Sequence, residues 1–327
     1  MDIKEFIQSV KEEQNGFQFG KPWRYNKSSL TAILPILREI TEERGYVTFA
    51  EANKVKIEDS GSIDTIFVTN NEDKPMFVRA GEIFKGKTQE RAVVISRIVM
   101  PKQTARIKVV CIHASKPISV GAEMSRGGIT PRSVENVMVM NSMESNLQSN
   151  VWSANASWAM NATSDIRAYA ASSRREDLSD LMDSPIEDYA QPVVDDLVKN
   201  METFSKQIAE VLRSVPKTPW QVGTVLLGVD GVMGFECFDL ADSWTSIRED
   251  IVRKEGEELI KEDQDGVFEY KPEKAKRNTT KVLGLKFSEK DLYKDNDSQT
   301  VALELDSYIG EVTLLKDSVI HLNLTKR

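Results

Sequence analysis

One segment of the chain has the residue types and the spacing that could bind a phosphate group. Residues 81–88, Gly-Glu-Ile-Phe-Lys-Gly-Lys-Thr, fit the pattern G-x-x-x-x-G-K-[ST] letter for letter. In that pattern backbone amides surround the phosphates, the lysine (here Lys87) reaches the outer phosphates, and the hydroxyl binds Mg²⁺. A strand-like run at residues 76–80 precedes the segment. Residues 225–230, which end in Asp230, are a candidate for the Walker-B strand of such a site. A P-loop ATPase is therefore one hypothesis.

Three features of the same segment argue against a phosphate loop. The positions between the two glycines hold Glu-Ile-Phe-Lys, where close approach of the backbone to phosphate favours small residues. The carboxylate of Glu82 would bring a negative charge toward the phosphates. The β-branched residues that follow Thr88 favour a strand over the helix that the motif requires. The surrounding sequence also lacks the strand–helix alternation of an α/β fold.

The same turn and its exit could bind an anion without being a P-loop. Functional groups are often presented on such turns by a rigid scaffold. Arg91 and Lys87 would donate hydrogen bonds to a phosphate group. In the structural alternative, Glu82 and Arg91 pair with each other and with turn amides, and so stabilise the hairpin. The candidate ligand-binding residues are Gly81, Glu82, Gly86, Lys87, Gln89 and Arg91.

Four residues elsewhere are secondary candidates. Arg126 precedes two glycines and could face a phosphate, and Trp152 could stack on a base or a ribose. Glu236 and Asp239 could act together as an acid–base pair. Each has a structural alternative, because aromatic residues at helical spacing are often core residues and carboxylates at a strand end often face solvent.

Cys111 and His113 lie two residues apart on a predicted strand, and so share one face of it. A Cys–His pair could form a nucleophile and its base. The shared face is otherwise apolar, which favours an inert core thiol, since reactive thiols lie in polar and partly exposed places.

Composition excludes several classes of function. The chain has 327 residues, a formal net charge of -8 and 40% hydrophobic residues, so it can form a large core but disfavours binding to nucleic acid or anionic membranes. With two histidines and two cysteines it has few ligands for a zinc enzyme, and we expect no metal site. The acidic N-terminus, the absence of a long apolar run and the low cysteine content predict a cytoplasmic protein.

The elements that would position these residues are those of an α+β, β-rich fold. We predict an N-terminal arm at residues 1–26 and a β-sandwich-like domain at 27–140, where short β-branched runs alternate with turns. Residues 141–327 are expected to form a helical and mixed α+β segment that packs on this domain, with a mobile charged loop at 261–280.

The clearest predicted helix covers residues 193–215. Its apolar residues recur at steps of four and three, a heptad seam that is barely three heptads long and therefore favours packing on the domain over a free coiled coil. The N-terminal arm and this helix are the surfaces through which a homo-oligomer could form.

The segment around Gly81 resembles a prokaryotic family named for its association with ADP-ribosylglycohydrolases and rhodanese- or phosphatase-type proteins. The resemblance rests on Ala80-Gly81-Glu82, then Gly86, Gln89-Glu-Arg91 and Cys111, and more weakly on residues 145–245 and 300–323. It implies a β-rich domain with a link to NAD or ADP-ribose metabolism. Where the family carries Cys-x-Glu, this chain has Cys-Ile-His at residues 111–113.

Three functional hypotheses follow. The first is a protein that binds an anionic, nucleotide-like ligand such as ADP-ribose, contacted by residues 81–91. The second is a structural, self-assembling or partner-binding protein, and the third is an enzyme, either a P-loop-like ATPase or a hydrolase of nucleotide derivatives. The sequence favours binding over catalysis and identifies no cofactor.

Overall fold

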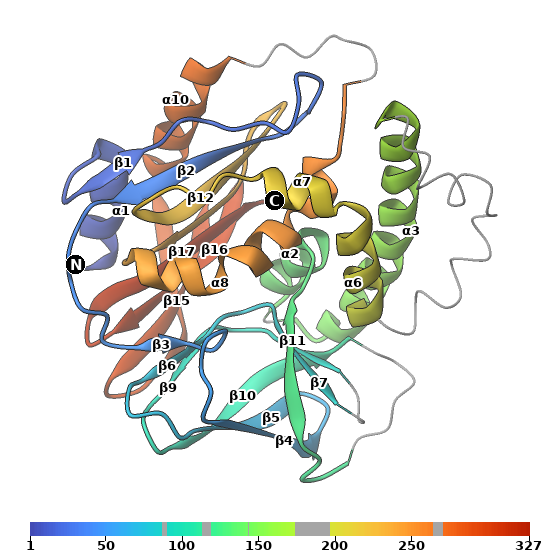
Figure 1. Ribbon diagram of the computed structural model, residues 1–327. Helices are drawn as coiled ribbons and strands as arrows, with labels where there is room; N and C mark the ends of the chain where they lie inside the picture. Colours follow the sequence, from blue (N-terminus) through green and yellow to red (C-terminus); the bar gives the residue numbers. More distant parts are fainter. Residues whose placement is uncertain (87–89, 113–118, 143, 174–196, 264–270) are drawn as a thin grey trace.

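The computed structural model describes residues 1–86, 90–112, 119–142, 144–173, 197–263 and 271–327. Its largest sheet is antiparallel and joins the two ends of the chain, because β1 and β2 lie beside strands from the C-terminal half (Figure 1). In spatial order this eight-stranded sheet consists of β1 (Phe17–Phe19), β2 (Ala32–Arg38), β12 (Gln221–Gly228), β13 (Gly231–Phe238), β17 (Ser318–Lys326), β16 (Tyr308–Leu315), β15 (Ser298–Leu305) and β14 (Phe287–Lys294).

A second sheet has six strands and closes on itself. Its outer strands meet at a bridge between Glu58 and Glu123, and the amide of Asp59 donates to the carbonyl of Ala122 at 3.0 Å. Closure leaves little free strand edge for other chains to pair with. The strands in order are β11 (Met124–Ile129), β7 (Glu82–Gly86), β8 (Arg91–Val93), β10 (Thr104–Cys111), β5 (Thr65–Asn70) and β4 (Val55–Ser62).

A three-stranded sheet lies between these two. Its strands are β3 (Val47–Thr48), β6 (Met76–Val78) and β9 (Arg97–Val99). Phe77 of β6 packs against Phe238 of β13, with ring centroids 6.1 Å apart, so this sheet joins the six-stranded sheet to the eight-stranded one. The predicted α+β, β-rich fold is confirmed.

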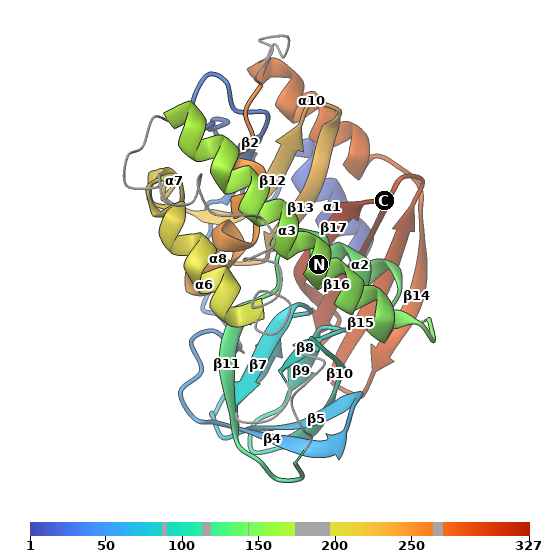
Figure 2. The ribbon, with the colours of Figure 1, turned by 90° about the vertical axis from the view of Figure 1, so that its right-hand side faces the viewer.

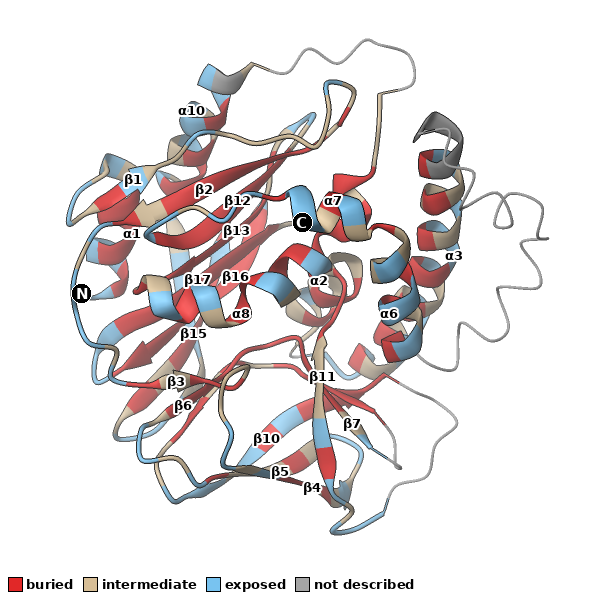
Figure 3. Ribbon diagram, viewed as in Figure 1, coloured by how far each residue is buried: buried red, intermediate tan, exposed pale blue. Residues whose placement is uncertain are grey.

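The helices cover both faces of the eight-stranded sheet (Figures 1 and 2). On one face α1 (Ile3–Glu12) and α10 (Pro272–Leu283) share a core with the strands. The residues of β2 are buried on both faces, since Leu34 belongs to this core and Ile33 to the opposite one (Figure 3). On the other face lie α2 (Arg132–Met140), α3 (Leu147–Ser173), α6 (Leu197–Gln207), α7 (Ala209–Ser214), α8 (Ala241–Lys254) and α9 (Gly256–Leu259).

The N-terminal segment packs on the body of the protein, and the expectation of a loop at 261–280 changes. The N-terminal arm is part of the fold, because Phe6 and Phe17 are fully buried and in edge-to-face contact. The expected mobile loop at 261–280 contains the first nine residues of α10, and residues 264–270 lie outside the described part. Buried Ala275 and Val282 hold this helix on the sheet, while its many charged residues, which suggested a loop, face outward.

The heptad-spaced apolar residues pack within the chain, as predicted. The described part of the predicted helix is divided into α6 and α7 at Ile208. Trp158 of α3 contacts Phe204 of α6, with ring centroids 5.8 Å apart. The buried seam residues are Leu197, Met201, Phe204, Ile208, Val211 and Val215. No helix in the described ranges is long and apolar enough to span a bilayer.

Close pairing of β16 with β17 depends on a glycine. A Cβ at Gly310 would overlap the backbone carbonyl oxygen of Asn323 on the neighbouring strand. We expect Gly310→Ala to lower the free energy of unfolding by about 2 kcal/mol, because two hydrogen-bonded strands must move apart. Urea unfolding should detect the loss. Gly45→Ala is the matched control, since nothing lies within 4 Å of its added methyl group, and equal stability of the two variants would contradict the prediction.

Candidate functional site

The segment that matched the phosphate-loop pattern is a strand. Residues Glu82–Gly86 form β7, which pairs with β8 and β11, and β8 follows where a P-loop would have a helix. Gly81 has a left-handed φ of 86° and lies against Arg79 and Thr130, and a Cβ at Gly86 would come within 2.9 Å of the Glu123 carbonyl oxygen. The glycines therefore allow close packing of the chain on itself. Lys87 and Gln89 lie outside the described residues.

The side chains of Glu82 and Arg91 have different partners. Glu82 is fully buried and accepts two hydrogen bonds from Arg126, at 2.7 Å from Nε and 3.1 Å from Nη2. Arg91 is fully buried with one guanidinium nitrogen 4.0 Å from a carboxylate oxygen of Asp59. The predicted pairing of Glu82 with Arg91 is therefore replaced by two separate pairs. Because both side chains are fully buried, their charged groups contact other protein groups and are not exposed to solvent.

The remaining sequence candidates are dispersed. Cys111 is buried opposite Arg91 in the sheet, while His113 lies outside the described residues. Trp152 is on the outer side of α3 and is 36% exposed, so it remains a candidate for stacking. Asp239 is partly buried and accepts a 2.6 Å hydrogen bond from Tyr46. Desolvation raises the pKa of Asp239 to about 6, although Tyr46 and a nearby arginine lower it.

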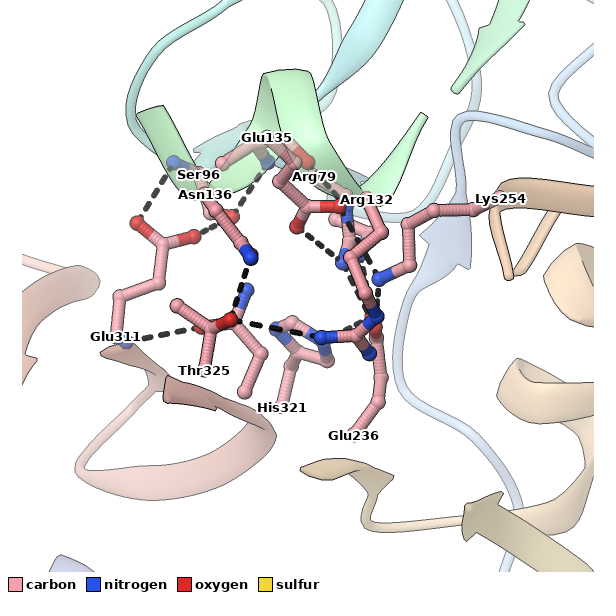
Figure 4. A network of polar contacts seen from close by, with 12 residues as sticks. Arg79, Ser96, Arg132, Glu135, Asn136, Glu236, Lys254, Glu311, His321 and Thr325 are labelled. Carbon is pink, nitrogen blue, oxygen red and sulfur yellow. Dashed lines mark hydrogen bonds and ion pairs between the residues drawn. The ribbon is translucent and has the colours of Figure 1, made fainter. Parts of the chain in front are cut away.

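Glu236 belongs to a buried network of charges between the sheets (Figure 4). Arg79, with none of its side chain exposed, donates to both carboxylate oxygens of Glu236 and, at 2.6 Å, to Glu135 of α2. The ammonium group of Lys254 in α8 lies 2.8 Å from Glu236 and 3.1 Å from Glu135. Arg79 and Lys254 thus neutralise Glu135 and Glu236, and each cation contacts both carboxylates.

These charges set the ionisation of the carboxylates. Burial alone would raise the pKa of Glu236, but Arg79 and Lys254 outweigh it and hold this pKa well below its ordinary value. His321 of β17 is also fully buried, with Nε2 3.0 Å from Glu236, and burial lowers the pKa of its imidazole. Glu236 is therefore a carboxylate at neutral pH, with its oxygens occupied by protein donors.

The network extends on both sides. Arg132 of α2 pairs with Glu255, and Thr325 donates to Asn136. On the other side Glu311 of β16 accepts hydrogen bonds from Ser96, and burial raises the pKa of Glu311 to about 7 despite them.

The cavity beside the network is too small for an organic ligand. It has a volume of about 20 Å³ and is lined by Glu135, Glu236 and Lys254 among others. A single water needs about this much space. The described residues also include no group of three or more acidic, histidine or cysteine side chains that could hold a metal ion. The network therefore serves to join elements.

A much larger hollow is a groove between α6–α7 and α8, with a volume of about 840 Å³. Ligand pockets for small molecules generally measure about 300–1,000 Å³. The two helical segments run in opposite directions, since Arg248 contacts Val215 and Gly256 contacts Ile208. The groove is lined by Glu202, Ser205, Lys206, Ala209, Leu212, Arg213, Lys217, Arg248, Glu249, Val252 and Arg253.

Positive charge dominates this groove. Five of its lining residues are cationic and two are carboxylates, whereas the whole chain carries a net charge of -8. Glu249 lies 3.6 Å from Lys217, and Glu202 lies 3.6 Å from Lys85. Lys206 and Arg213, by contrast, form no ion pair with any residue that the structure describes.

Arg248 is the most deeply placed cation of the groove. It is 8% exposed and donates from Nη2 to the carbonyl oxygens of Val215 and Pro216, at 2.7 and 2.9 Å. Its buried Nε has no hydrogen-bond partner within the described part of the chain. A buried donor without a partner is costly.

Helix α8 connects the groove to the network. Lys254 points into the network, while Arg248, Val252 and Arg253 line the groove. Between them Asp250 binds Arg126 at 2.7 Å. The sequence analysis did not identify the groove cations or Lys254.

The network predicts a large loss of stability on truncation. Glu236→Ala would leave Arg79 and Lys254 buried with one carboxylate between them. We expect it to lower the free energy of unfolding by about 3–5 kcal/mol. Glu43→Ala, which breaks the exposed pair with Lys74, is the control and should unfold close to the wild type in urea. A Glu236 variant as stable as this control would contradict the account.

Glu311 predicts a specific dependence of stability on pH. Its pKa of about 7 in the folded protein lies above the unfolded value of about 4.3, so the native state retains a proton that the unfolded state has lost. Its contribution to stability therefore decreases as the pH rises from about 4 to about 7. Relative to Glu311→Gln, the wild type should lose up to about 3 kcal/mol over this interval in urea unfolding. Parallel stability–pH curves would refute this.

Comparison with known proteins gives a family and nothing closer. The model of the ARG and Rhodanese-Phosphatase-superfamily-associated Protein domain matches residues 16–325. No curated protein and no solved structure matches the chain. The match begins just before β1 and ends in β17, so it includes the three sheets, the buried network and the groove. The chain belongs to the ARG and Rhodanese-Phosphatase-superfamily-associated Protein domain family.

Proposed function

We propose that the protein binds an anionic, nucleotide-like small molecule in the groove between α6–α7 and α8. The observation that carries the proposal is the buried Arg248, whose Nε lacks a hydrogen-bond partner in the described chain and which lines a cationic groove of about 840 Å³. Desolvated arginines bind phosphate oxygens strongly, because their hydrogen bonds are charge-assisted.

The lining of the groove suits a ligand with distinct anionic and apolar parts. Arg213, Lys217 and Arg248 gather at the end near Pro216, since Arg248 donates to the carbonyl oxygen of that residue. Ala209, Leu212 and Val252 supply apolar surface along the groove. A diphosphate would lie at the cationic end and a base or ribose over the apolar side chains.

The family supports ADP-ribose as the first ligand to test. The family's name associates it with ADP-ribosylglycohydrolases, and ADP-ribose carries both a diphosphate and two ribose rings. In this proposal Glu82 and Arg126 do not contact the ligand. Arg126 pairs with both Glu82 and Asp250 of α8, and so helps to hold that helix in place. The proposal is one of binding, without a bond being broken.

A thermal-shift screen with ADP-ribose, ATP·Mg²⁺ and inorganic phosphate tests the groove. ADP-ribose at about 100 times its dissociation constant should add about 2.7 kcal/mol of stability and raise the Tm by several degrees. Arg213→Gln, Lys206→Gln and their combination should abolish most of this shift, because they remove cations that line the groove. Neither residue has a described ion-pair partner to lose, so these changes should leave the fold itself intact. Lys281→Gln, an exposed lysine of α10, is the control and should retain the shift.

Other outcomes would contradict the proposal. A shift that persists in the Lys206 and Arg213 variants would place the ligand elsewhere. A shift abolished by Lys87→Ala alone would return the site to residues 81–88. The absence of a shift with all three compounds would argue against nucleotide-like ligands altogether.

A further inference from the structure

A chain of ion pairs leads from the groove to a buried carboxylate. Arg253, which lines the groove, donates to Oδ1 of Asp250 at 3.1 Å. The other oxygen of Asp250 lies 2.7 Å from Nη1 of Arg126. Arg126 in turn donates to both oxygens of Glu82, at 2.7 and 3.1 Å. Four alternating charges thus connect the protein surface to β7.

The two ends of this chain differ in exposure. The side chain of Arg253 is 41% exposed, those of Asp250 and Arg126 are 15% and 21% exposed, and that of Glu82 is 1% exposed. Arg253 alone of the four lines the groove, so a ligand anion there contacts Arg253 and acts on Glu82 through Asp250 and Arg126. Arg79 is the other charged group that acts on Glu82.

We propose that anion binding in the groove is coupled to proton uptake by Glu82. This inference rests on the proposed function. A ligand phosphate that attracts Arg253 takes that cation away from Asp250. Asp250 then competes more strongly with Glu82 for Arg126, and its less neutralised charge acts on Glu82 at close range. The Glu82 carboxylate responds by taking a proton from solvent and becoming a neutral carboxyl group.

Glu82 is poised for this change near neutral pH. Burial raises the pKa of Glu82 to about 7; Arg126 and Arg79 lower it, and Asp250 raises it. Binding that raises this pKa further must, by linkage, be tighter where Glu82 is protonated. The affinity for the anion should therefore increase as the pH falls through about 7.

Isothermal titration with ADP-ribose tests the coupling, because the diphosphate of that ligand does not itself titrate near neutral pH. We expect binding to the wild type to be about threefold tighter at about pH 6 than at about pH 8, which corresponds to a rise of about half a unit in the pKa of Glu82. Repeating the titration in buffers with different ionisation enthalpies should show proton uptake at about pH 7.

Two variants separate this coupling from a general effect of pH on the groove. Glu82→Gln keeps an oxygen acceptor for Arg126 but cannot titrate, and Asp250→Asn removes the charge that relays the signal. Both should bind ADP-ribose without proton uptake and with little dependence on pH. Thermal melts without ligand establish that each variant is folded, and either one suffices for the test.

The results that would overturn the inference differ from those that would overturn the proposed function. Binding without proton uptake in the wild type, or uptake that persists in Glu82→Gln, contradicts the coupling and leaves the groove as a ligand site. Failure of the wild type to bind ADP-ribose, inorganic phosphate or ATP removes the groove proposal and the coupling together.

Discussion

Burial of the Arg79 guanidinium between the sheets is the interaction on which the rest of the structure depends. A fully buried cation needs paired carboxylates, and these come from β13, through Glu236, and from α2, through Glu135. The two carboxylates in turn require Lys254 at the end of α8. One charge therefore holds β13, α2 and α8 together, and a change at any of the paired residues leaves a buried charge unpaired. The orientation of α8, and with it one wall of the groove, follows from this requirement.

At one end of the groove α9, which follows α8, packs closely on α6–α7. Gly256 at the start of α9 allows that close approach, since a Cβ there would come within 2.6 Å of Ile208 and 3.2 Å of Phe204. The apolar sides of these helices are buried in the core, so their charged residues face outward and toward each other across the groove. In an acidic protein, a rigid surface with an excess of cations attracts anions from solution.

Local patterns in the sequence predicted much of the fold. The buried seam of α6 and α7 and the strands on both sides of Gly81 follow from periodicity and β-branched residues. The partnership of β2 with the C-terminal strands, the closure of the six-stranded sheet and the helix α10 did not, because they depend on contacts between distant residues or on a few apolar side chains among many charges. For the same reason the sequence indicated Glu82, Arg126 and Glu236 as functional but could not show that their partners are protein groups.

The central claim is that ligand anions bind between α6–α7 and α8, whereas the β7 segment that fits the phosphate-loop pattern is structural. Chemical-shift mapping with ADP-ribose on the isotopically labelled protein tests this most directly. The account predicts that the largest changes fall on the amide groups of Lys206, Arg213, Lys217 and residues 248–253, with small changes at Ile83 and Phe84. Changes centred on residues 81–91, with the groove unaffected, would contradict it.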